Sequence, residues 1–137
     1  MITASIEIKA QFYDLDPMQI VWHGNYVRFF EQARSALLDR ISYNYNEMYE
    51  SGYAWPIVDM RLKYVKPIHF AQEVIIEAKL VEYESRLKIE YLITDKETGH
   101  RINKGYTVQV AVGIEDQEMR LASPDVLINL VEAYQCV

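Results

Sequence analysis

Several features that would place this chain in other protein classes are scarce or missing. The 137 residues contain one cysteine, Cys136, so no internal disulfide framework can form and cysteine supplies no metal site. Fourteen Lys and Arg residues stand against twenty Asp and Glu residues, and the net charge of −6 leaves no surplus of positive charge for nucleic acid phosphates. We therefore expect a protein of a reducing compartment that binds no nucleic acid.

Long apolar runs are also missing. No stretch approaches the roughly 18 consecutive apolar residues of a transmembrane helix. The first residues lack the basic start of a secretory signal, and Glu7 and Lys9 interrupt any early apolar run. We expect no membrane insertion and a cytoplasmic location. No linker or low-complexity segment divides the chain, whose length suits a single domain over residues 1–137.

What is present is a clear alternation of apolar and polar residues. From Ile6 to Phe12 this alternation has a period of two and predicts a half-buried strand. From Tyr26 to Ile41 the apolar residues follow helical spacing, with Asn25 expected as the N-cap. Further strands are expected at residues 57–65, 74–83, 86–95 and 102–113, with short helices within residues 43–53 and after Ser123, which is expected to cap the latter.

This order of elements predicts the fold class. A helix with one broad apolar face needs a sheet to cover it, and the strands after residue 56 are joined by short turns that favour antiparallel pairing. We therefore expect an α+β fold in which the long helix is wrapped by a curved antiparallel sheet of five or six strands. An open sheet leaves an edge strand exposed, so pairing of two copies edge to edge is expected.

The loop before the long helix carries the residues of greatest chemical interest. Asp14, Asp16 and His23 lie just upstream of the predicted helix N-terminus. A carboxylate in that position can act as a base or nucleophile, and the free N–H groups of the helix end can stabilise a developing oxyanion. The arrangement suits acyl transfer, whereas an Asp before Pro that has no partner is usually turn chemistry.

The motif around this loop resembles the 4-hydroxybenzoyl-CoA thioesterase family of the hot-dog fold, close to the Tol-Pal-associated acyl-CoA thioesterases. The resemblance rests on Tyr13-x-x-Asp16-Pro, on Trp22-His23-x-Asn25-Tyr26-x-x-Phe29-x-Glu31-x-Ala33-Arg34, and more weakly on Val65-x-Pro67-Ile68-x-Phe70. It implies hydrolysis of an acyl-CoA thioester without a metal or other cofactor. It also implies a site shared between two subunits of a homodimer, with dimers that often pair into a homotetramer.

The resemblance assigns roles to residues one by one. Asp16 is the nucleophile or general base, and the backbone N–H of His23, at the helix N-terminus with Gly24 and Asn25, polarises the thioester carbonyl. For the His23 imidazole, positioning of water or substrate and a capping or packing role are both open. We also expect Trp22 and Tyr26 at the acyl pocket and Glu31 near the substrate. Candidates for the CoA phosphates are Lys63, Lys66, Arg86, Lys88 and Arg120, with Arg120 preferred and an ordinary solvated charge as the alternative for each. Where this chain has Gln19 the family usually has Gly, and the paired arginines that bind CoA phosphates in some members are absent near Arg86.

Two other functions remain open from the sequence. A hot-dog dehydratase or hydratase would use His23 and Glu31, but would leave the Asp16-Pro17 motif unexplained. A non-catalytic acyl-binding module would fit Gln19 in the loop and the tyrosine-rich segment 43–53. His69 and His100 are expected at turns or on the surface, so the three histidines predict no metal cluster.

Overall fold

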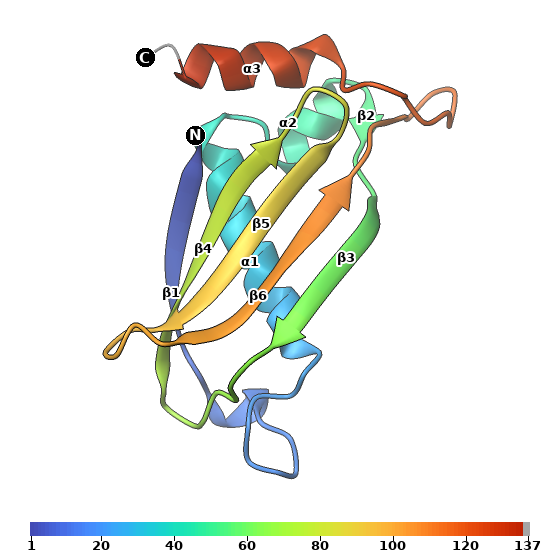
Figure 1. Ribbon diagram of the computed structural model, residues 1–137. Helices are drawn as coiled ribbons and strands as arrows, with labels where there is room; N and C mark the ends of the chain where they lie inside the picture. The colour runs from blue at the N-terminus through green and yellow to red at the C-terminus, as the bar shows by residue number, and fades with distance from the viewer. Residues whose placement is uncertain (136–137) are drawn as a thin grey trace.

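A computed structural model describes residues 1–135, and Cys136 lies outside the described residues. One long helix, α1 (Asn25–Arg40), lies against one face of a five-stranded antiparallel sheet (Figure 1). The strands are β1 (Thr3–Lys9), β4 (Glu73–Glu82), β5 (Leu87–Asp95), β6 (Arg101–Gln109) and β3 (Ile57–Tyr64), in that spatial order. The predicted hot-dog architecture, a long helix packed on a curved antiparallel sheet, is confirmed.

Smaller elements complete the chain. They are the 3₁₀ helix η1 (Phe12–Asp14), helix α2 (Tyr45–Glu50), the paired short strands β2 (Tyr53–Ala54) and β7 (Val112–Gly113), and helix α3 (Asp125–Gln135). Figure 1 shows the loop between β1 and α1 at one end of the sheet, whereas α2, β2 and α3 lie at the other. No helix of residues 1–135 is long and apolar enough to cross a membrane.

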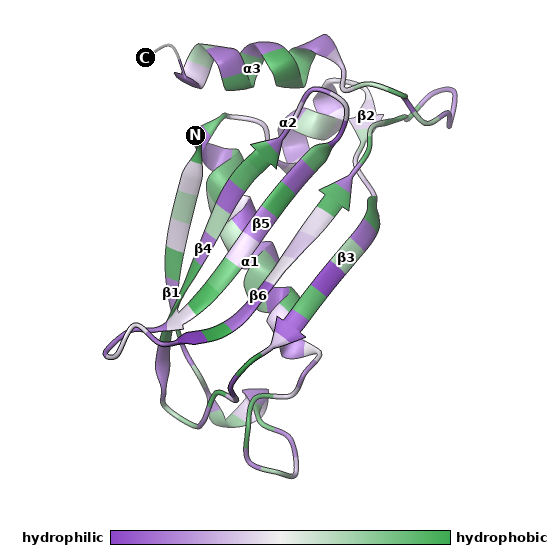
Figure 2. Ribbon diagram, in the orientation of Figure 1, coloured by the Kyte–Doolittle hydropathy of each residue, from purple (hydrophilic) through white to green (hydrophobic). Residues whose placement is uncertain are grey.

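The core is the interface between α1 and the sheet. Along the strands, hydrophilic and hydrophobic residues alternate, so that one face of the sheet is apolar (Figure 2). Phe30 of α1 stacks on Tyr91 of β5 with ring centroids 4.4 Å apart. Gly105 of β6 makes this approach possible, because a Cβ there would overlap the Arg61 carbonyl oxygen and lie 2.8 Å from the Phe30 ring.

The predicted strand 6–12 needs correction. β1 ends at Lys9, and Phe12 belongs to η1 with its side chain 81% exposed instead of sharing the buried face. The reason is local: the Asp14 carboxylate accepts a hydrogen bond from the Gln11 N–H at 2.8 Å, which stabilises a turn where the strand would continue.

Three further boundaries differ from the predictions. The strand expected at 102–113 leaves the large sheet after Gln109, and Val112 and Gly113 pair with β2 instead. α1 begins at Asn25 itself with Gly24 as N-cap, so Asn25 is no cap. Ser123 does not cap α3, since its Oγ has no hydrogen-bond partner within residues 1–135 and the Pro124 carbonyl accepts from Leu127 and Ile128 instead.

Candidate active site

Asp14 holds the loop that precedes α1. Its carbonyl oxygen accepts hydrogen bonds from the Trp22 N–H at 2.9 Å and from Asn25 Nδ2 at 2.8 Å, so the Asn25 side chain ties the helix start to the loop. With its carboxylate already engaged by Gln11 and its surface only 5% exposed, Asp14 is structural. It positions the chain at the entrance of α1.

Asp16 lies on a tight turn within the same loop. Its N–H donates to the Ile20 carbonyl at 2.9 Å, and its Oδ1 accepts from the Met18 N–H at 2.8 Å. Gln19 closes the turn with φ of +63°, in the left-handed region that glycine adopts most readily. The Gln19 side chain is exposed to solvent. The turn has a backbone conformation that suits glycine, although the residue is Gln.

The turn places Asp16 at a cavity of about 350 Å³. Its walls are Asp16, Met18, Ile20 and Val21 from the loop, His23 and Tyr26 from the start of α1, and Tyr64, Val65, Lys66 and Pro67 from the end of β3. Predominantly apolar walls with a few polar groups are typical of small-molecule sites. Three residues singled out from the sequence, Asp16, His23 and Tyr26, therefore meet in one place.

The start of α1 offers backbone donors beside this cavity. Within residues 1–135, the N–H groups of His23 and Gly24 donate to no acceptor, whereas the Asn25 N–H donates to the Trp22 carbonyl at 2.9 Å. Asn25 is thus unsuited to the expected donor role, and His23 and Gly24 remain. Gly24 has no room for a side chain, because a Cβ would overlap the indole of Trp22.

Two tyrosines frame the cavity. Burial is the main cause that raises the pKa of Tyr26; a hydrogen bond to the Ile68 backbone partly offsets it, and the charges of Tyr64 and Asp16 raise it further. Tyr26 therefore stays a neutral phenol near the carboxylate. Tyr64 packs edge-on against it with ring centroids 5.1 Å apart, and its hydroxyl donates to the His23 carbonyl at 2.8 Å. This bond fixes the helix start against β3.

Three other residues predicted for the site lie outside this cavity in the single chain. Trp22 is 49% exposed and packs against the His23 ring. Glu31 is directed to a different cavity and lies 3.5 Å from Arg34. Arg120 binds Asp116 at 2.9 Å beside β2, in the loop region that Figure 1 shows at the opposite end of the sheet.

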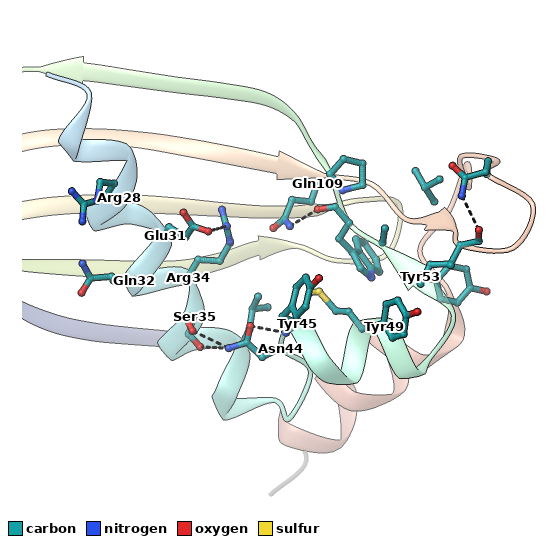
Figure 3. Close-up of a pocket in the computed structure, with 18 residues that line it drawn as sticks. Arg28, Glu31, Gln32, Arg34, Ser35, Asn44, Tyr45, Tyr49, Tyr53 and Gln109 are labelled. Atoms are coloured by element: carbon teal, nitrogen blue, oxygen red, sulfur yellow. Dashed lines mark hydrogen bonds and ion pairs between the residues drawn. The ribbon is translucent and has the colours of Figure 1, made fainter.

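The second cavity, at that opposite end, is larger, about 1060 Å³ (Figure 3). Aromatic residues of α2 and β2 form one wall, and Glu31 and Arg34 of α1 lie across from them. Gln109 of β6 supplies a buried amide whose Nε2 donates to the Trp55 carbonyl at 2.7 Å, while its Oε1 has no partner within residues 1–135. Sequence reasoning missed Gln109; its signal was a lone polar residue in the apolar run 108–113.

The class of protein follows from fold and sequence together. A family model described as the Thioesterase-like superfamily matches residues 10–130, so the chain belongs to this superfamily. A dihydroxynaphthoyl-CoA (DHNA-CoA) thioesterase from Staphylococcus aureus has a similar structure, with a TM-score of 0.85 and 26% identity over 99% of this chain and 91% of that chain. A 4-hydroxybenzoyl-CoA thioesterase, solved with its substrate, shares the fold with a TM-score of 0.82 at 18% identity, over 95% and 99% of the two chains.

The chain is also similar to a putative acyl-CoA thioesterase of Bacillus subtilis, YneP. The two are 31% identical over 77 residues, and this match spans 56% of each chain. The hot-dog fold, the superfamily and these relatives together support thioester hydrolysis. Within residues 1–135, no three His, Cys, Asp or Glu side chains are grouped so as to hold a metal ion.

Proposed function

We propose that this protein is an acyl-CoA thioesterase in which Asp16 acts at the thioester carbonyl. The observation that carries the proposal is that Asp16 and His23 line one cavity, and that within residues 1–135 the N–H groups of His23 and of the next residue, Gly24, donate to no acceptor. Backbone donors fixed at a helix start can stabilise the oxyanion of a tetrahedral intermediate without reorganising during the reaction. Thioester hydrolysis needs both a carboxylate that acts as base or nucleophile and donors that stabilise the oxyanion.

The reaction consumes one water molecule and breaks the carbon–sulfur bond. Either Asp16 attacks the carbonyl carbon and the resulting anhydride is hydrolysed, or Asp16 takes a proton from water as the water attacks. In both routes the carbonyl oxygen becomes negative at the N–H groups of His23 and Gly24. Collapse of the tetrahedral intermediate breaks the carbon–sulfur bond and expels the CoA thiolate, which takes up a proton. In the general-base route this step leaves the free acid. In the nucleophilic route it leaves an anhydride with Asp16, which water then hydrolyses to the free acid and the Asp16 carboxylate. Tyr26, a neutral phenol near Asp16, can donate a hydrogen bond within the same cavity.

The complete site is proposed to need a second copy of the chain. β3 is an edge strand on which nearly every residue is exposed, including Ile57, Val58 and Met60. Antiparallel pairing of two β3 strands would place the Tyr64 end of one chain beside the Ile57 end of its partner. The Asp16 cavity of one copy would then lie near the larger cavity of the other, which would bring Glu31 toward the substrate.

Further exposed apolar side chains near Asp16 support this assembly. Large apolar residues rarely gather on a surface that stays in contact with water. At this end of the sheet the exposed ones are Phe12, Tyr13, Met18, Trp22, Tyr64, Val65 and Phe70. We propose a homodimer with shared sites, with a dimer of dimers as its further assembly. We also propose that the chain belongs to the 4-hydroxybenzoyl-CoA branch near the Tol-Pal-associated enzymes. In this proposal it lies in the cytoplasm and forms a single domain over residues 1–137.

The alternative functions have less support from the geometry. A dehydratase would use His23 and Glu31, and it would leave without a role the Asp16 carboxylate that lines the same cavity as His23. A binding module was favoured by Gln19, yet the Asp16 turn keeps a conformation that suits glycine despite this residue.

The test is release of free thiol from a panel of acyl-CoA thioesters. Asp16→Asn should lower kcat by at least about 100–1,000-fold, the range typical for losing one element of oxyanion stabilisation. Glu31→Gln is measured beside it, because Glu31 is the other carboxylate that the proposed assembly brings toward the substrate. Near-normal turnover by Asp16→Asn would refute the assignment, and a dead Glu31→Gln enzyme with an active Asp16→Asn enzyme would transfer the catalytic role to Glu31.

A further inference from the structure

A positively charged groove of about 440 Å³ lies on the outer face of the sheet. Its cations are Arg61, Lys63, Lys79, Arg101 and Lys104, and its carboxylates are Glu77 and Glu90. The side chains of Lys104 and Tyr106 point away from α1, because a Cβ on Gly105 between them would meet Phe30 of that helix. Such a surplus of positive charge is unexpected in a chain whose net charge is −6.

The strand register makes this charge unfavourable in the protein alone. Lys63 of β3 lies directly opposite Lys104 of β6, and like charges in this position destabilise a sheet. Arg61 lies two residues further along the same face of β3. The groove's carboxylates are on β4 and β5. Glu90 is opposite Lys79 and Tyr106, whereas the residue opposite Lys104 on β5 is the uncharged Leu92.

These cations are also unpaired. In the described part of the chain, none of the five forms an ion pair, although Arg86, Lys96 and Arg120 each do. Arg86 forms an ion pair with Glu82 at 3.0 Å, so its charge is already balanced. A cluster of free cations that repel one another is stabilised when an anion binds between them.

The groove is a close neighbour of the Asp16 cavity. Tyr64, Val65 and Lys66 line that cavity, while Lys63, the residue before them, lines the groove. Lys63 and Tyr64 follow each other at the end of β3, so the two sites meet at this strand end. A substrate whose carbonyl lies at Asp16 can extend its pantetheine arm around the end of β3 toward the groove.

We propose that this groove binds the phosphate groups of the substrate's thiol carrier, chiefly those of CoA. The inference rests on the proposed thioesterase function. Lys63, Lys104 and Arg61 provide charge-assisted hydrogen bonds to phosphate oxygens. The guanidinium of Arg61 can bind two oxygens of one phosphate at once. The groove contributes to substrate affinity and takes no part in bond breaking.

The kinetic test compares the Lys63→Gln/Lys104→Gln double variant with wild type on two thioesters of the same acid. For acyl-CoA, KM should rise by about tenfold or more at unchanged kcat, because charge-assisted contacts to phosphate are lost. For acyl-pantetheine, which has no phosphate, KM should stay the same. Lys9→Gln, on the same face at the opposite edge strand, is the matched control and should behave as wild type.

A third substrate identifies the source of the phosphate. A carrier-protein thioester has a single phosphodiester. If the double variant has a higher KM than wild type for that substrate alone, the groove binds phosphate and the carrier protein supplies it. Equal KM values for wild type and double variant on both phosphate-bearing substrates would overturn the proposal. An equal KM rise on acyl-pantetheine would overturn it as well.

A binding measurement separates this inference from the proposed function. Free CoA should raise the melting temperature of wild type, whereas pantetheine should not, and the double variant should lose the CoA effect. If wild type cleaves no thioester but shows this pattern, the proposed function fails and the phosphate site stands. If wild type cleaves thioesters while CoA stabilises both proteins equally, the phosphate site fails alone.

Discussion

Single residues of the Asp16 loop have strained or crowded conformations that serve their neighbours. Gln19 has a positive φ within the turn that orients Asp16, and Gly24 carries no side chain where the Trp22 indole needs the space. Asn25 uses its side chain to bind the Asp14 carbonyl instead of capping the helix. Each arrangement directs the loop toward one geometry, with the Asp16 carboxylate and His23 on the same cavity.

The strain at Gln19 can be measured. Gln19→Gly should stabilise the protein by about 0.5–1 kcal/mol, because glycine avoids the cost of a Cβ at positive φ but gains more freedom in the unfolded chain. Gln19→Ala is the control, since it removes the exposed side chain and keeps the Cβ. Urea unfolding of the three proteins gives the comparison. Equal stability of the Gly and Ala variants would show that the turn is not strained.

At the scale of elements, contacts with the sheet set the position of α1. Phe30 stacks on Tyr91, and Gly105 leaves space for that ring from the adjacent strand. Just before the helix, the Tyr64 hydroxyl of β3 donates to the carbonyl of His23 and so anchors the first turn. The position of the helix, and with it that of the proposed oxyanion donors, is thus set by contacts with the sheet.

Gly105→Ala tests this packing. The added methyl group would overlap the Arg61 carbonyl oxygen and press on Phe30, and overpacking of this kind costs about 1–3 kcal/mol. Lys104→Ala, on the outer face of the same strand, should change the free energy of unfolding far less. Chemical denaturation measures both, and an unchanged midpoint for Gly105→Ala would contradict the close approach.

At the scale of the whole molecule, the free edge at β3 and the two separated cavities point to the same assembly. Two-fold pairing along β3 would cover exposed apolar side chains and bring the Asp16 end of each copy toward the large cavity of the other. The outer faces of the two sheets would then form one continuous surface, with the basic groove of each copy near the shared edge.

Met60→Lys tests this assembly. Met60 is 38% exposed on the edge strand, and a charge there in both copies should oppose pairing. Light scattering should show a shift from dimer to monomer, and thiol release should fall with it. Ser5→Lys, at the opposite edge strand, is the control and should leave the assembly intact. A wild-type protein that is a fully active monomer would refute the shared site.

The sequence by itself determined the order of the main elements and the residues to watch. Helical spacing from residue 26 to 41 predicted α1 to within one residue at each end, and the predictions of β3, β4 and β5 also agree to within one residue at each end. These signals are local: each depends on which side chains must leave water, and neighbouring residues decide that. The Asp16-Pro17 and His23 motif was visible because its residues are close together in the chain and resemble the motif of a known family.

Only the tertiary structure decided which of these residues meet. It placed Asp16, His23 and Tyr26 at one cavity and moved Glu31 and Arg120 away from it. It also engaged the Asn25 N–H, left those of His23 and Gly24 free, and put Lys63 opposite Lys104. Sequence could not give these facts, because strand register and loop hydrogen bonds join residues far apart in the chain, and their geometry exists only after the sheet has closed around the helix.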